Sequence, residues 1–190
     1  MRAIEIEFKY NADDISLLQF NVFCAARGEA KYFEASGFDH FFENPKEPDT
    51  FYRHRIGTSK NELTLKCKKV STNNFIRDED NIELHKKTSR IKVQDWLLKH
   101  DYHYNTSIFK NCFIYEYDTH TLVYYICYDS SMKELGRFIE IEMSEEHDWA
   151  NEQEAWDVLL VVEKACKPLG LSVQCRVKRS LWEMFRKDTK

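Results

Sequence analysis

The sequence predicts an α+β protein built on an antiparallel sheet, and three features of the chain support this prediction. Stretches in which apolar and polar residues alternate recur along its length. Short segments containing Asn, Gly, Pro or Ser separate most of these stretches, as expected for strands joined by turns. The regular β-α-β alternation of a parallel sheet does not occur in the sequence. About eight strands are expected, which is enough for closure into a barrel.

The first predicted strand covers residues 3–10 and sets the pattern for the others. Its sequence, AIEIEFKY, alternates strictly, so one face is apolar and the other carries Glu5, Glu7 and Lys9. The remaining strands are predicted at residues 38–42, 51–56, 62–69, 81–85, 107–115, 121–128 and 137–143.

Three helices and a helical turn complete the expected order of elements. Residues 11–14 supply capping groups for a first helix, which has Ile15, Leu18 and Val22 at helical spacing and stops near Gly28. A short helix is predicted at residues 93–100 and a longer amphipathic helix at 152–167. The tail, residues 172–186, is predicted to form a strand followed by a helical turn.

Length and composition narrow the class of protein. A chain of 190 residues fits one domain, residues 1–190. Acidic residues outnumber basic ones by 32 to 28, so the chain as a whole has no general attraction to nucleic acid or an anionic membrane. The six cysteines include no C-x-x-C pair, which indicates reduced thiols. No apolar stretch is long enough for a signal peptide or a membrane span, and a cytoplasmic location is expected.

Charged side chains are sorted by sign on the polar faces of the predicted strands. One strand carries Glu5 and Glu7, another Arg53 and Arg55, a third Thr64, Lys66 and Lys68 beside Glu62, and a fourth Glu140 and Glu142. Two interpretations are open, because half-buried strands always have a charged solvent side. Solvent faces usually mix signs, however, and sorted charges pointing into a barrel would need counter-ions. Divalent cations beside the carboxylates and a triphosphate beside the basic groups would provide them.

Several motifs in the same order along the chain resemble the CYTH superfamily of triphosphate tunnel enzymes. Glu5-Ile6-Glu7-Phe8-Lys9 is similar to its E-x-E-x-K signature. Further matches are the R-x-R strand at residues 53–55, the L-T-x-K strand at 63–66, the D…L-G-x-F-x-E-I-E segment from Asp129 to Glu142, and Arg179-Ser180 in place of a terminal Lys-Ser pair.

The resemblance implies a closed eight-stranded antiparallel barrel, the triphosphate tunnel, with helices packed outside it. It also implies a metal-dependent enzyme that uses Mg²⁺ or Mn²⁺, with two ions expected. The implied metal ligands are Glu5, Glu7, Asp129, Glu140 and Glu142. The implied substrate-binding residues are Lys9, Arg53, Arg55, Lys66, Lys110 and Arg179. Lys9, Glu5 and Glu7 are the implied catalytic residues.

One departure from the family pattern keeps alternative functions open. The family's basic-x-basic pair is Lys110-Asn111-Cys112 here, so its second basic residue is missing. Hydrolysis of a triphosphate such as tripolyphosphate, thiamine triphosphate or a nucleoside triphosphate is the leading prediction. The alternatives are an adenylyl cyclase that makes cyclic AMP and pyrophosphate, and a binder of triphosphates or polyphosphates without activity. No membrane partner is expected, and no nucleic acid other than an RNA 5′-triphosphate end. The protein is expected to be a monomer or homodimer.

Overall fold

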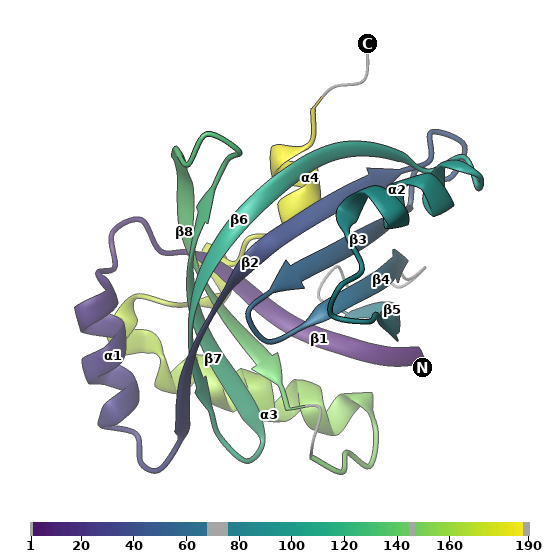
Figure 1. Cartoon of the computed structure of the whole chain (residues 1–190). Helices are drawn as coiled ribbons and strands as arrows, with labels where there is room; N and C mark the ends of the chain where they lie inside the picture. Colours follow the sequence, from purple (N-terminus) through teal and green to yellow (C-terminus); the bar gives the residue numbers. More distant parts are fainter. Residues whose placement is uncertain (1, 68–75, 145–146, 188–190) are drawn as a thin grey trace.

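The computed structural model describes residues 2–67, 76–144 and 147–187, which form eight strands and four α-helices (Figure 1). The strands are β1 (Arg2–Asn11), β2 (Lys31–Glu43), β3 (Thr50–Gly57), β4 (Asn61–Cys67), β5 (Ile76–Glu83), β6 (His103–Glu116), β7 (His120–Tyr128) and β8 (Glu134–Met143). The helices are α1 (Leu17–Ala25), α2 (Arg90–Leu98), α3 (Glu152–Ala165) and α4 (Leu181–Phe185). Among these residues, no helix combines the length and the apolarity needed to cross a bilayer.

All neighbouring strands pair antiparallel, in the cyclic order β1-β5-β4-β3-β2-β6-β7-β8. β1 completes this circuit with two separate halves: residues 2–6 pair with β5, and residues 7–11 pair with β8. Each half of β1 therefore has a ladder to only one neighbouring strand among the described residues. The predicted antiparallel α+β fold is confirmed, but the sheet is strongly curled (Figure 1) rather than a barrel closed along its full height.

The outer face of β1, β7 and β8 carries the main hydrophobic core. Side chains alternate across a strand, so Ile6, Phe8 and Tyr10 point outward, and each is fully buried. They pack with residues of α1 and α3, such as Phe20 and Leu159. A second outer cluster lies under α2 and consists of Phe42, Leu63, Val93, Leu97 and Tyr102. The alternate side chains of these strands therefore point into the interior of the curled sheet.

One end of the interior is apolar and is covered by α4. Leu181 and Trp182 of this helix lie with Phe41, Phe51 and Ile108 in a third hydrophobic cluster. The rings of Trp182 and Phe51 stack with their centroids 4.8 Å apart. Apolar side chains therefore dominate this end of the interior.

The first helix differs from the one predicted. Residues 11–14 do not cap it, because Ser16 and Gln19 form a reciprocal capping box and α1 begins only at Leu17. Phe20 and Cys24 are its buried residues, whereas Leu18 and Val22 are 73% and 63% exposed. The spacing of Ile15, Leu18 and Val22 did not identify the buried face of the helix.

The other elements occur where predicted, with different lengths. β2 and β5 begin several residues before the predicted strands, and the predicted residues Lys68 and Lys69 lie outside the described part of the chain. The tail contains a single bridge, between Tyr10 and Arg176, in place of the predicted strand. The helical turn predicted after it is α4.

Candidate metal and phosphate site

The charged faces identified in the sequence point into the curled sheet. The register of β1 against β8 places Glu7 opposite Glu142 and Lys9 opposite Glu140. Glu7, Lys9 and Glu140 are buried, with 6%, 3% and 5% of their surface exposed. The inward interpretation of these faces is therefore confirmed, and the solvent interpretation is wrong for these strands.

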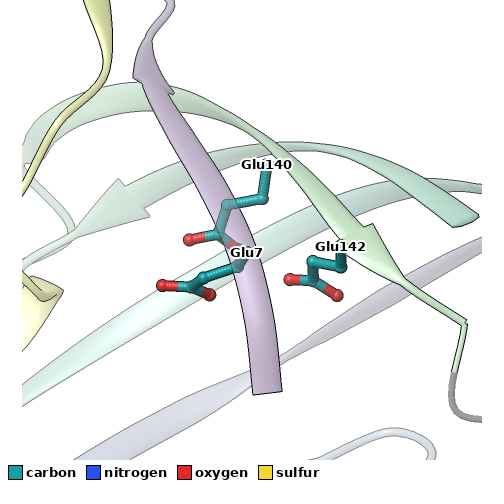
Figure 2. Close-up of side chains that lie close together, drawn as sticks. All are labelled: Glu7, Glu140 and Glu142. Carbon is teal, nitrogen blue, oxygen red and sulfur yellow. The ribbon is translucent and has the colours of Figure 1, made fainter. Parts of the chain in front are cut away.

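Three glutamates gather where β1 meets β8. Ligand oxygens of Glu7, Glu140 and Glu142 all lie within 4.8 Å of one another. Figure 2 shows the three side chains close together, Glu7 from β1 and Glu140 and Glu142 from β8. Carboxylate oxygens are the donors that Mg²⁺ and Mn²⁺ prefer, so the donor chemistry of this cluster fits the ions that the family resemblance implied.

Lys9 and Tyr125 contact two of these carboxylates. The Nζ of Lys9 lies 3.2 Å from Oε1 of Glu7 and 3.1 Å from Oε1 of Glu140. The hydroxyl of Tyr125 donates a hydrogen bond of 2.6 Å to the same oxygen of Glu140. The ammonium group thus bridges β1 and β8 at the carboxylate cluster.

The cluster separates the pKa values of its two glutamates on β8. Burial raises the pKa of Glu142 well above its ordinary value, and the charges of Glu140, Glu7 and Glu5 raise it further. Burial and Glu7 also act to raise the pKa of Glu140, but Lys9, Lys110 and Tyr125 outweigh them, so that pKa is lowered. Crowded carboxylates of this kind gain strongly from a shared cation.

A second group of carboxylates, formed by Glu5 of β1 and Glu79 of β5, surrounds Lys66. The Nζ of Lys66 donates to both oxygens of Glu5, at 3.3 Å and 3.0 Å, and also pairs with Glu79. Burial, Glu7 and Glu79 raise the pKa of Glu5 to about 7 in spite of Lys66. The pKa of Glu79 is lowered to about 2, because Lys66, Arg53 and a hydrogen bond with Glu5 outweigh the effect of burial.

The two arginines of β3 each contact an acidic side chain. Arg55 donates from Nε and one Nη to the two oxygens of Asp39, at 2.7 Å and 2.9 Å. Asp39 is only 2% exposed, and Arg55 keeps its pKa low although burial acts to raise it. Arg53 donates to Glu62 at 3.4 Å and to the hydroxyl of Thr64 at 3.2 Å. Both guanidinium groups are held on the interior wall.

Lys110 and Cys112 occupy the wall of β6. The ammonium group of Lys110 lies 3.9 Å from the centre of the Tyr125 ring, a cation–π contact. The pKa of the Cys112 thiol is raised, chiefly by burial. The position of the missing second basic residue thus faces the interior, where it presents a neutral thiol.

Two adjoining cavities lie in the interior of the curled sheet. The outer one, of about 320 Å³, reaches Phe33, Gly37 and Met143, and the inner one, of about 200 Å³, reaches Lys9, Arg53 and the α4 residues Leu181 and Trp182. Residues that line both are Glu5, Asp39, Arg55, Lys60, Glu79, Lys110, Cys112, Ile114, Val123 and Glu142. The predicted carboxylates and cations, except Asp129 and Arg179, therefore surround one continuous space.

Two predicted site residues lie elsewhere. Asp129 stands in the turn between β7 and β8, where its Oδ1 accepts hydrogen bonds from Ser131 and from the backbone of Lys133. Hydrogen bonds from Ser131 lower its pKa. Arg179 is exposed just before α4 and lines neither of the two cavities. The structure does not bring these two residues to the carboxylate cluster.

Asp39 and Glu79 are interior carboxylates that sequence reasoning did not select as site residues. Asp39 is the only charged residue in the stretch Phe38–Phe42, and a buried strand with one carboxylate is a signal that could have been used. Glu79 belongs to the stretch Arg77-Asp78-Glu79-Asp80, where charges occupy both faces. Only the register of β5 against β4, which places Glu79 opposite Lys66, identifies it.

Solved structures with the same fold include proteins of different kinds. The PH1012 protein of Pyrococcus horikoshii has a TM-score of 0.72 at 19% identity, covering 94% of this chain and 98% of that one. A putative adenylate cyclase from Vibrio parahaemolyticus has a TM-score of 0.65 at 15% identity, covering 95% and 97%. A chain of the Schizosaccharomyces pombe Mediator head module has a TM-score of 0.66 at 13% identity, covering 87% and 96%.

The sequence comparisons gave no match: no protein-family model and no curated protein is similar to the chain. The structural likenesses, all at low identity, demonstrate a shared fold. The chain thus shares its fold with a putative adenylate cyclase.

Proposed function

We propose that this protein is a metal-dependent enzyme that processes a triphosphate in the interior of its curled sheet, by hydrolysis of a phosphoanhydride bond. The observation that carries the proposal is the cluster of Glu7, Glu140 and Glu142, whose ligand oxygens lie within 4.8 Å of one another and which shares its cavity with Lys9 and Arg53. Acidic and basic groups enclosed together suit a metal and a phosphate chain, since each neutralises one set.

Glu7, Glu140 and Glu142 would hold one Mg²⁺ or Mn²⁺, and Glu5 with Glu79 would hold a second. Bound there, such ions neutralise phosphate oxygens and acidify a water molecule, as in two-metal catalysis generally. The protein's part is to keep these carboxylates fixed on β1, β5 and β8 and to exclude bulk solvent. Phosphoryl transfer needs little more than such positioning and charge neutralisation.

The phosphate chain would be held by Lys9, Arg53, Arg55, Lys66 and Lys110. Four of these five side chains already contact a carboxylate, and Lys110 lies over Tyr125. A polyanion therefore gains full use of them only when the carboxylates take other cations. Lys9, which contacts Glu7 and Glu140, would move from these oxygens to a phosphate oxygen and support the leaving group.

The experiment that tests this function is a substrate panel with Mg²⁺ and with Mn²⁺. Purified protein is given tripolyphosphate, thiamine triphosphate, ATP and an RNA with a 5′-triphosphate end, and released phosphate is measured. Metal-dependent phosphate release from at least one of them is expected. Binding without turnover would contradict the enzyme and support a binder.

Adenylyl cyclase activity is a second candidate, favoured by the putative adenylate cyclase that shares the fold. In that reaction the ribose 3′-oxygen of ATP attacks its own α-phosphate, so cyclic AMP and pyrophosphate form. The same panel separates the two reactions, because ATP then yields cyclic AMP with pyrophosphate and tripolyphosphate yields nothing. Release of orthophosphate from tripolyphosphate would exclude a cyclase as the sole activity.

A further inference from the structure

The second half of β1 has a neighbour on its other edge that is not a strand of the sheet. Alternate residues of a strand direct their backbone groups to opposite edges. The N–H of Ala12 donates to the carbonyl of Arg137 on β8, so even-numbered residues here face β8. The carbonyl of Lys9 faces the other edge, from which β5 has diverged, and there it accepts a hydrogen bond of 2.7 Å from the N–H of Val177.

The backbone of residues 176 and 177 thus covers the part of β1 that carries Lys9. Arg176 also forms the single bridge to Tyr10. Three residues further along, Ser180 begins the stretch with Leu181 and Trp182 that lines the inner cavity. The segment 176–182 is therefore the piece of wall that lies between β1 and the α4 end of the interior.

A buried clasp on the outer face holds this segment. The guanidinium of Arg176 donates to both oxygens of Glu163 on α3, each at 2.7 Å, and lies 3.6 Å from the centre of the Phe8 ring. The hydroxyl of Tyr10 donates to Glu163 at 2.5 Å. The side chains of Arg176 and Glu163 are 5% and 4% exposed. Each charge is thus satisfied within the triad, as a buried ion pair requires.

The clasp and the charged cluster occupy opposite faces of the same three residues of β1. Phe8 and Tyr10 point outward into the clasp, and Lys9 between them points inward to Glu7 and Glu140. A charge on Lys9 acts strongly only while the wall beside it excludes water. The clasp fixes both the wall and the backbone from which Lys9 extends.

We infer that Glu163, Arg176 and Tyr10 are positioning residues, which hold the segment 176–182 against β1 so that Lys9 works in an enclosed site. This inference rests on the proposed function, since it assigns a role in that reaction to residues outside the interior. None of the three residues lines either cavity.

The test compares Glu163→Gln, which removes a charge and keeps the shape, with Lys164→Gln at the exposed neighbouring position on α3. Amide hydrogen exchange is followed by NMR at Val177, and at Ala12 as the reference on the β8 edge. In Glu163→Gln, exchange at Val177 is expected to rise at least tenfold while exchange at Ala12 stays unchanged. Tyr10→Phe, which keeps the ion pair, is the milder variant and should give a smaller rise.

Steady-state kinetics with the best triphosphate from the panel provide the second readout. In Glu163→Gln, kcat is expected to fall about tenfold with KM changed less than threefold, because the other cations still bind substrate. Unchanged exchange at Val177 in both variants would overturn the clasp. Faster exchange with unchanged kcat would overturn its positioning role. A wild-type protein inactive on every triphosphate contradicts the proposed function instead, and exchange at Val177 then still decides whether the clasp holds the wall.

Discussion

From Ile6 to Tyr10 both faces of β1 are buried, but they are stabilised by different forces. Outward, Ile6, Phe8 and Tyr10 are fully buried against the helices. Inward, Glu7 and Lys9 are nearly as inaccessible, yet they contact other charged groups. Burying apolar surface stabilises a fold, whereas burying ion pairs often contributes nothing or costs stability. The comparison indicates that the outer face supports the fold, and the proposed function assigns the chemistry to the inner face.

The largest expected effect comes from the inner face. Glu7→Gln removes one carboxylate of the three-glutamate cluster, and kcat with Mg²⁺ should fall about a thousandfold, roughly 4 kcal/mol of barrier. The folded state should not lose comparable stability, because the variant also relieves crowding of buried charge. Glu34→Gln, on the exposed surface of β2, is the control and should retain full activity. Wild-type activity in Glu7→Gln would show that the cluster is not the reaction site.

The outer face should respond in the opposite way. Leu159 of α3 is fully buried in the main core, so Leu159→Ala should lower the free energy of unfolding by about 3 kcal/mol. Urea denaturation measures the loss. Val161 of the same helix is 65% exposed, so Val161→Ala should lower the free energy of unfolding by less than about 0.5 kcal/mol. If the two substitutions cost the same, the assignment of stability to this outer core is wrong.

His40 sharpens the comparison, because it is a polar residue on the outer side of β2. Its Nδ1 shares a hydrogen bond of 2.5 Å with the hydroxyl of Ser107. Burial, together with the charges of the nearby His54 and Arg90, lowers the pKa of His40 to about 4. The unfolded chain therefore takes up this proton first as the pH falls. The contribution of neutral His40 to the free energy of unfolding is therefore fully present above about pH 6.5 and is lost progressively toward pH 4.

The direction of this pH dependence gives a measurable prediction. Between pH 7 and pH 5 the wild-type protein should lose about 2 kcal/mol of unfolding free energy through His40, and His40→Gln should lose that much less. Denaturation by urea at the two pH values gives both quantities. His103→Gln, at an exposed position of β6, should leave the pH difference as it is. A His40→Gln variant with the full wild-type pH dependence would refute the assignment.

The smallest expected effect concerns two matched helix caps. Ser16 caps α1 outside the sheet and Ser180 caps α4 at the inner cavity, and each forms a capping box with the residue three positions later. Ser16→Ala and Ser180→Ala should each cost about 1 kcal/mol of stability. Calorimetry with tripolyphosphate should detect weaker binding only in Ser180→Ala. Equal affinities in the two variants would show that α4 does not contribute to the binding of tripolyphosphate.

Strict alternation made the inner faces predictable from sequence. The side-chain period of a strand is two residues, so Glu5, Glu7 and Lys9 had to share a face, as did Glu140 and Glu142. The sorting of their signs then indicated an enclosed space. That inference required no knowledge of which strands are neighbours.

Features that depend on tertiary contacts were not predictable in this way. The start of α1 is an exception, because the capping box of Ser16 and Gln19 is a local S-x-x-Q pattern that the sequence already contains. Glu79 becomes a site residue only through the register of β5, and Asp39 through its contact with Arg55. Asp129 and Arg179 stand in a turn and in a segment before a helix, where no periodicity fixes the direction of a side chain.

The central claim is that the inner carboxylates and cations serve a metal and a triphosphate together. Isothermal calorimetry tests it most directly, by comparing the affinity of preformed Mn²⁺–tripolyphosphate with that of tripolyphosphate in a chelator. Wild-type protein should bind the metal complex at least tenfold more tightly, about 1.4 kcal/mol, and Glu7→Gln should lose this preference. Equal affinity for the two forms in the wild-type protein would contradict the account.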